Sequence, residues 1–134
     1  MRLFLVRHAD AEPGEPDELR ALTPEGRDEA RALGERLAAE GVRPDAVLTS
    51  PLLRARETGA AVAGELGCES ESSDLLGPGA TAADLRAAVA GRGETVIVIG
   101  HQPDCGRIAA ELGNGIEPPF PPAGVAEVRL SSSL

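Results

Sequence analysis

Both histidines of this chain, and two of its arginines, follow short aliphatic segments. Arg7 and His8 come directly after residues 2–6, and His101 comes one glycine after residues 95–99. Arg54 lies five residues beyond a third such segment, residues 46–49. Because the carboxyl ends of parallel strands meet at one edge of a sheet, where ligands bind, we expect these four side chains to converge on one pocket.

A cluster of two guanidinium and two imidazole groups suits phosphoryl chemistry. Guanidinium groups bind a tetrahedral oxyanion through paired hydrogen bonds and stay charged at any working pH. A neutral imidazole can attack phosphorus and form a covalent intermediate, while a protonated imidazole donates to the phosphoryl oxygens. Phosphoryl transfer needs mainly positioning and charge stabilisation, so we expect neither a metal nor a cofactor.

Taken singly, each of these residues has an ordinary structural explanation. A histidine after a buried strand is commonly a hydrogen-bonded loop residue, and Arg54 on a helix face could pair with Glu57. Arg7 could simply donate to a backbone carbonyl. The joint placement of all four residues at strand ends is what favours a functional site.

The composition excludes several classes of function. The chain has 134 residues, 42% of them hydrophobic, which predicts one compact domain over residues 1–134. All 13 cationic side chains are arginine, and the chain has no lysine, tryptophan or tyrosine. Schiff-base lysines, phosphate-loop lysines and aromatic base-stacking platforms are therefore absent. A net charge of -9 argues against binding to nucleic acid or to anionic membranes.

The expected location is the cytoplasm. Two cysteines, Cys68 and Cys105, make no disulfide framework and are expected to be reduced thiols. The aliphatic runs are far shorter than a membrane span, and the first residues do not resemble a secretory signal.

The alternation of aliphatic runs and helical periodicity predicts an α/β domain with a mostly parallel sheet. Besides the three strands above, we expect a weak edge strand at residues 68–71 and a half-buried edge strand at 125–130. Helices are expected to begin at Thr23-Pro24, at Ser50-Pro51, after Thr81 and near Pro103. The Thr81 and Asp84 pair is typical of a capping box.

The site motif resembles a known family. The segment Arg7-His8-Ala9 is similar to the Arg-His-Gly signature of the histidine phosphatase superfamily. Within this superfamily, the short length of the chain and its Arg20-x-Leu22-Thr23 segment most resemble the bacterial SixA-type phosphohistidine phosphatases. Three further motifs follow in the family's order: Leu22-Thr23-x-x-Gly26, Thr49-Ser50-Pro51-x-x-Arg54-Ala55-x-x-Thr58 and Gly100-His101-x-Pro103.

The resemblance implies a three-layer α/β/α sandwich and a set of roles. His8 would be the nucleophile, Arg7 and Arg54 the phosphate ligands, and His101 the second catalytic imidazole. Arg20 is a candidate for a further anion contact, although a solvated loop arginine is the plainer interpretation. Asp74 is the nearest candidate for the general acid of larger relatives, although a loop cap is the plainer interpretation there.

The sequence departs from the family at Ala9, which replaces the usual glycine beside the nucleophile. A small methyl group should fit, but it could shift the backbone amide that approaches phosphate.

These observations predict a metal-independent phosphatase that forms a phosphohistidine intermediate on His8. No segment is long enough to form a lid, and the P–N bond has a better leaving group than a sugar phosphate, so protein phosphohistidine is the expected substrate. The alternatives are a phosphatase of a small phosphoester or nucleotide and a module that binds phosphorylated partners without turnover.

Two further alternatives use other residues. A metal-dependent phosphoesterase would take His8, Asp10, His101 and Asp104 as ligands, although the intervening arginines would repel the ion. A thiol enzyme built on Cys105 and His101 is disfavoured, because a buried structural cysteine is the more common role.

Overall fold

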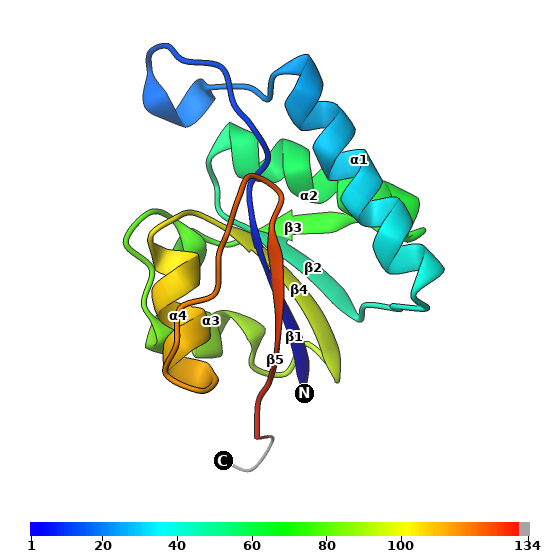
Figure 1. Cartoon of the computed structure of the whole chain (residues 1–134), viewed down its shortest axis with the longest axis vertical. Helices are drawn as coiled ribbons and strands as arrows, with labels where there is room; N and C mark the ends of the chain where they lie inside the picture. Colours follow the sequence, from blue (N-terminus) through cyan, green and yellow to red (C-terminus); the bar gives the residue numbers. More distant parts are fainter. Residues whose placement is uncertain (132–134) are drawn as a thin grey trace.

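The computed structural model describes residues 1–131, in which five strands form one sheet (Figure 1). The strand order is β3-β2-β4-β1-β5, and all neighbours are parallel except β5, which pairs antiparallel with β1. The elements are β1 (Arg2–Arg7), η1 (Asp17–Leu19), α1 (Pro24–Ala39), β2 (Ala46–Thr49), α2 (Leu53–Glu65), β3 (Ser70–Ser72), η2 (Asp74–Leu76), α3 (Ala82–Val89), β4 (Thr95–Gly100), α4 (Asp104–Leu112) and β5 (Val125–Arg129).

Helices cover both faces of the sheet, which gives the three layers that the family resemblance implies. Alternate residues of each central strand point to opposite faces. In β1, Leu3 and Leu5 pack toward α3 and α4, whereas Phe4 and Val6 pack toward α1 and α2. Figure 1 shows the two helix pairs on either side of the strands. The sequence prediction of a single α/β/α domain is confirmed.

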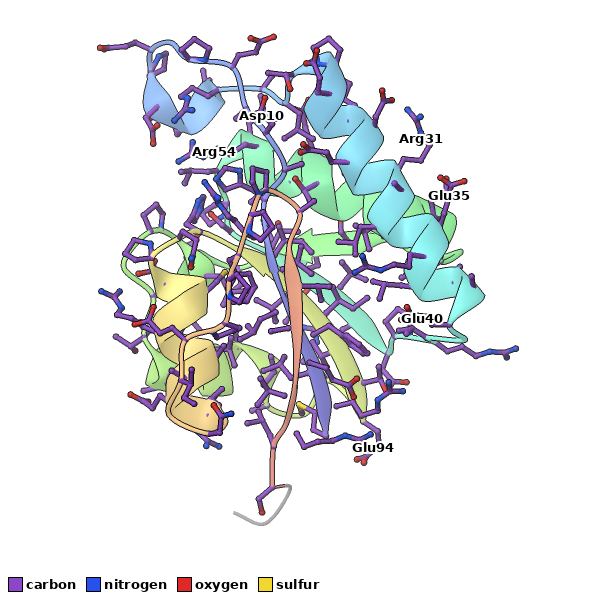
Figure 2. The ribbon with its side chains drawn as sticks, viewed as in Figure 1. Asp10, Arg31, Glu35, Glu40, Arg54 and Glu94 are labelled. Atoms are coloured by element: carbon purple, nitrogen blue, oxygen red, sulfur yellow. The ribbon has the colours of Figure 1, made fainter. Side chains whose placement is uncertain are left out.

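Charged side chains lie mainly outside these layers. Arg31, Glu35 and Glu40 extend from α1 and its end into solvent, whereas Arg54 lies at the end of the sheet where β1 stops (Figure 2). No helix within residues 1–131 is both long and apolar enough to span a membrane.

Two helix starts follow from side-chain capping, as the sequence predicts. Thr23 accepts a hydrogen bond from the Gly26 amide at 2.9 Å and caps α1. Thr81 and Asp84 form the predicted capping box of α3. The start of α2 differs, because the helix begins at Leu53 without a side-chain cap. The Ser50 hydroxyl, expected to open this helix, accepts from the amide of Leu52 at 3.2 Å and also contacts a histidine.

The first turn of α1 packs directly against the segment that follows β1. A side-chain carbon added at Gly26 would lie 2.0 Å from the Asp10 carbonyl oxygen, so only glycine fits there. The Thr23 amide donates to that same carbonyl at 3.0 Å. The spacing from Thr23 to Gly26 therefore holds the loop after His8 close to the helix.

Candidate functional site

The carboxyl ends of β1 and β4 carry the two histidines, as the sequence predicts. Arg7 is the last residue of β1, His8 follows it, and His101 follows β4. The two strands pair in register, with Arg7 opposite Gly100, so the imidazole rings come together with their centroids 5.2 Å apart. The main-chain amide of His8 also donates to the Gly100 carbonyl at 3.0 Å, which fixes the spacing of the two loops.

The ring of His8 is oriented by its neighbour in the chain. Its Nδ1 lies 2.7 Å from the Ala9 carbonyl oxygen. A carbonyl only accepts, so Nδ1 carries the proton and the neutral ring keeps its lone pair on Nε2. Burial lowers the pKa of His8, the bond to Ala9 opposes that effect, and the nearby Arg54 and Arg7 lower the pKa further. These effects favour the neutral form of His8, with the lone pair on Nε2.

His101 is held by the residue that follows β2. Its Nε2 lies 2.7 Å from the Ser50 Oγ, and both side chains are buried. Burial, followed by the neighbouring His8 and Arg54, lowers the pKa of His101 to about 4, and Asp17 opposes the shift. In the free protein at neutral pH, His101 is thus uncharged. It becomes a cation only if a bound anion raises its pKa.

Arg54 lies in the first turn of α2 and is 7% exposed. It donates to Asp17 twice, from Nη1 to the main-chain carbonyl at 2.9 Å and from Nη2 to the carboxylate at 3.2 Å. The pairing of Arg54 with Glu57 that the sequence allowed does not occur. Glu57 accepts from the Leu22 amide at 2.8 Å and lies 3.5 Å from Arg27.

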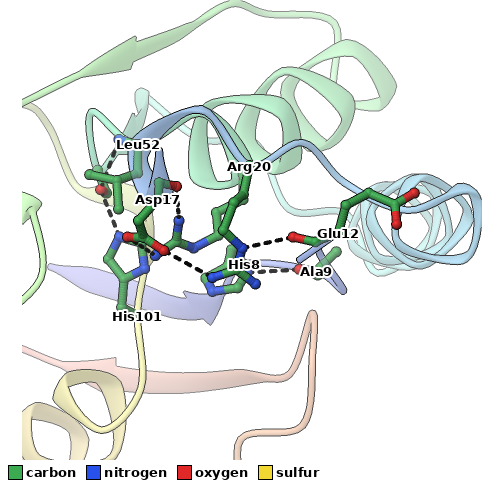
Figure 3. A network of polar contacts seen from close by, with 9 residues as sticks. His8, Ala9, Glu12, Asp17, Arg20, Leu52 and His101 are labelled. Carbon is green, nitrogen blue, oxygen red and sulfur yellow. Dashed lines mark hydrogen bonds and ion pairs between the residues drawn. The ribbon is translucent and has the colours of Figure 1, made fainter. Parts of the chain in front are cut away.

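Arg20 reaches the same cavity from the loop after β1. Its Nη1 donates to the Asp17 carboxylate at 3.0 Å, and its Nε donates to the Glu12 carbonyl at 2.7 Å (Figure 3). The bonds from Arg20 and Arg54 lower the pKa of Asp17. Arg20 therefore lines the cavity wall, although its side chain is still 29% exposed in the loop, and its contact with an anion stays a prediction.

Arg7 has a donor without an acceptor. One Nη donates to the Phe120 carbonyl at 3.0 Å, which fixes the guanidinium beside the histidines. Its Nε is the only buried side-chain nitrogen or oxygen within residues 1–131 that has no hydrogen-bond partner. Leaving a buried donor unpaired costs about 1–3 kcal/mol. An oxyanion bound in the cavity would supply the missing acceptor.

These side chains surround one cavity of about 320 Å³. It has three guanidinium groups, two imidazoles and a single carboxylate. The lining residues are Arg7, His8, Asp17, Arg20, Arg54, Pro78, His101 and Gln102. The structure thus brings together the four residues on which the sequence prediction rested, with Arg20 beside them.

Ala9 does not disturb the site in the way the sequence suggested. Its amide donates to the Thr58 Oγ1 at 3.0 Å, and Thr58 in turn donates to the Arg54 carbonyl at 2.8 Å. The methyl group is fully buried against Leu22 and Ala30. The amide is therefore committed to Thr58, and the extra methyl group fills a small apolar cluster.

Asp74 is the one candidate that the structure leaves outside. It is exposed at the start of η2 and lines a neighbouring hollow with residues 75, 77–80 and 84. Ser73 caps this turn by accepting from the Leu75 amide at 3.3 Å. The role of Asp74 as a general acid stays a prediction, without support from its position.

The proposed metal ligands do not converge. The Asp10 carboxylate accepts from the Thr23 hydroxyl at 2.8 Å. Asp104 accepts from the Gly79 amide at 2.7 Å and pairs with Arg107. Both carboxylates are engaged in holding loops, and residues 1–131 contain no cluster of three metal-ligating side chains.

Cys105 has the properties of a structural thiol. It is buried, and its Sγ lies 3.7 Å from the Val6 carbonyl oxygen. Burial raises its pKa to about 12, so the thiolate needed for nucleophilic chemistry does not form at neutral pH.

Sequence reasoning missed three residues of the site. Ser50 and Thr58 were part of a quoted motif but had no role, and Asp17 was not singled out at all. The signal for Asp17 was its spacing, because an acid three residues before Arg20 can pair with it in one helical turn. No sequence pattern indicated that Asp17 would also reach Arg54, 37 residues away.

An α/β/α sandwich with two histidines and three arginines around one cavity at its strand ends defines a class of phosphate-handling protein. Residues 3–77 match the model of the histidine phosphatase superfamily (branch 1), and the chain belongs to this family. The matched range includes Arg7, His8 and Arg54, and His101 lies beyond it.

Individual relatives agree with the family assignment. The chain is 36% identical to the protein of Escherichia coli (strain K12) named phosphohistidine phosphatase SixA, over 99% of this chain and 88% of that protein. A solved structure of the protein histidine phosphatase SixA complexed with tungstate is 34% identical and matches with a TM-score of 0.89, over 99% of this chain and 90% of that one. YhfR of Bacillus stearothermophilus, 21% identical, shares the fold with a TM-score of 0.74 over 98% of this chain and 92% of its own.

Proposed function

We propose that this protein is a metal-independent phosphatase that removes the phosphoryl group from phosphohistidine on proteins, through a covalent intermediate on His8. The observation that carries the proposal is the orientation of His8. Its Nδ1 donates to the Ala9 carbonyl, so Nε2 is an unprotonated nucleophile in a cavity lined by three guanidinium groups. Imidazole nucleophiles of this kind form covalent phosphoryl intermediates.

The arginines bind the phosphoryl group. Arg7 and Arg54 both line the cavity, and each offers guanidinium N–H groups to a bound oxyanion. Guanidinium groups match phosphate oxygens in geometry and spread their positive charge over them. The bound group lies in front of His8, so that attack follows in line with the departing bond.

The reaction proceeds in two steps. In the first, the P–Nε2 bond of His8 forms while the bond from phosphorus to the leaving nitrogen breaks, and the electron pair stays with that nitrogen. In the second, water attacks phospho-His8 and releases inorganic phosphate, and the electron pair returns to Nε2. His101 stabilises the phosphoryl oxygens in both steps, because the bound anion raises its pKa and favours its cationic form.

The relatives support the choice of substrate. A protein similar over nearly the whole chain is named a phosphohistidine phosphatase. A similar solved structure, of a protein histidine phosphatase SixA, is complexed with tungstate, a tetrahedral oxyanion like phosphate. We also place the activity in the cytoplasm, since both cysteines are free thiols.

A comparison of substrates tests the proposal. Purified protein is offered a phosphohistidine-bearing phosphotransfer domain, p-nitrophenyl phosphate and common sugar phosphates, each with a chelator present. We expect the phosphohistidine domain to give the highest kcat/KM, with no loss on chelation. A sugar phosphate or a nucleotide as the best substrate would favour a small-molecule phosphatase, and binding without turnover would indicate a recognition module.

A further inference from the structure

Asp17 is the one carboxylate among the described residues that line the histidine cavity. A negative charge is unexpected there, because the cavity otherwise gathers cations that suit a phosphoryl group. Asp17 lies on η1, in the loop after β1, and its side chain is 59% exposed. It therefore lies at the exposed side of the cavity, in contact with Arg20 and Arg54 (Figure 3).

Two arginines hold this carboxylate in place. Oδ1 accepts from Arg20 at 3.0 Å, and Oδ2 accepts from Arg54 at 3.2 Å. The main-chain carbonyl of Asp17 accepts a further bond from Arg54 at 2.9 Å, which fixes the backbone of the turn as well. Each carboxylate oxygen has a second lone pair, so Asp17 can accept another hydrogen bond from a group that enters the cavity.

We propose that Asp17 is a specificity residue that binds the leaving group, by accepting a hydrogen bond from the free N–H of the substrate's phosphorylated imidazole ring. The inference rests on the proposed function and adds to it a reason for preferring a P–N bond. The phosphoryl group enters deep between Arg7, Arg54 and His8, and the ring that carries it lies toward the rim, where Asp17 is.

The protonation state of the ring explains the benefit. When the second ring nitrogen carries a proton, the phosphorylated ring is cationic, and a carboxylate beside it stabilises this form. As the P–N bond breaks, its electron pair stays on the ring nitrogen and the ring leaves as neutral imidazole. The proton remains on the second nitrogen throughout. Asp17 therefore orients the ring and stabilises its cationic form without transferring a proton.

Asp17 has the opposite effect on oxygen leaving groups. A phenolate or an alkoxide has no N–H to donate and develops negative charge as it departs. The carboxylate at the rim repels that charge. Asp17 therefore favours phosphoimidazole substrates by attracting the ring N–H, and it disfavours phosphoesters by repelling the departing oxygen.

A ratio of two rates tests this role. Asp17→Asn is compared with the wild type on phosphoimidazole and on p-nitrophenyl phosphate, measuring kcat/KM for both substrates in the same preparation. Because a loss of folded protein lowers both rates together, it cancels in the ratio. We expect the ratio of phosphoimidazole to p-nitrophenyl phosphate to fall roughly tenfold, since a charge-assisted hydrogen bond becomes a neutral one.

Glu18→Gln is the matched control. Glu18 is the next residue on the same turn, is exposed and does not line the cavity, and its substitution removes the same charge. We expect its ratio to equal that of the wild type. A fall in the ratio for Glu18→Gln as large as that for Asp17→Asn would show a general charge effect and overturn the proposal.

Other outcomes separate this inference from the proposed function. If the wild type hydrolyses phosphoimidazole and Asp17→Asn changes both rates by the same factor, Asp17 only positions the arginines or competes with phosphate, and the inference alone is wrong. If the wild type hydrolyses p-nitrophenyl phosphate but not phosphoimidazole, the proposed function fails, and the inference fails with it.

Discussion

The histidine cavity is smaller than the hollow that α4 forms with β5, which has a volume of about 500 Å³. The charged groups of the larger hollow are already paired. Glu127 accepts from Arg2 at 2.8 Å and lies 3.4 Å from Arg129. In the smaller cavity, a buried donor of Arg7 has no acceptor.

This difference indicates that unpaired donors and convergent charge mark a binding site better than size does. A hollow whose charges neutralise one another gains little from an anion. A cavity with three guanidinium groups and one carboxylate keeps an excess of positive charge, although the whole chain carries -9.

The largest expected effect comes from removing the proposed nucleophile of the smaller cavity, His8. His8→Ala should abolish the phosphoenzyme and lower kcat by at least about a thousandfold. Rapid quench with labelled substrate should trap an acid-labile, base-stable label in the wild type. In His101→Ala, some label should still form slowly, because that ring does not bond to phosphorus.

Label that persists in His8→Ala and disappears in His101→Ala would reverse the two roles. An active wild type without label at any quench time would favour direct attack by water.

The second-largest effect is expected from a substitution that keeps the positive charge but replaces the planar guanidinium group. Arg54→Lys should lower kcat/KM by about ten- to a thousandfold, because an ammonium group is a point donor and cannot replace the guanidinium fork. Steady-state kinetics on the preferred substrate measure the loss. Wild-type activity in this variant would show that Arg54 does not take part in the reaction. The positive charge of the histidine cavity would then no longer distinguish it functionally from the larger hollow.

A smaller effect is expected from pH. His101 has a pKa of about 4 in the free protein, and a bound dianion raises it. The complex then holds more protons than the free protein, so lowering the pH from 7.5 to 5.5 should tighten sulfate binding by roughly tenfold. Sulfate stays a dianion over this range, and calorimetry in buffers of different ionisation enthalpy counts the protons taken up.

His101→Gln should remove most of this pH dependence. Sulfate binding that weakens as the pH falls would contradict the sign of the linkage.

The smallest effect is expected in the larger hollow. Ile116, which lines it, is 69% exposed, so Ile116→Ser should leave kcat/KM within about twofold of the wild type. The same assay used for Arg54→Lys measures it. A tenfold loss of activity would show that this hollow takes part in function after all.

The sequence allows much of the fold to be predicted because the decisive signals are local. Capping side chains mark α1 and α3, and aliphatic runs mark β1, β2 and β4. The predicted start of α2 at Ser50-Pro51 was wrong, because the helix begins at Leu53. The Ser50 hydroxyl accepts from the Leu52 amide just before the helix and also contacts His101, so it serves the site as well as the turn.

The convergence of the two histidines could also be predicted, since it follows from the parallel pairing of β1 with β4. The position of Asp17 could not, because a loop reaches Arg54 through contacts that no periodicity encodes. Asp74 is the converse case, in which the sequence suggests a role that the position of the residue does not support. Its place in the order of the chain resembles that of a general acid, but the turn that holds it faces a different hollow.

Thr58 has a consequence for how the site moves. One hydroxyl accepts from the amide beside His8 and donates to the carbonyl of Arg54. This hydroxyl, together with the two bonds from Arg54 to Asp17, ties the loop that carries His8 to the helix that carries Arg54. We therefore expect a displacement of either element to carry the other with it, which would keep the distance between the His8 ring and the Arg54 guanidinium nearly constant.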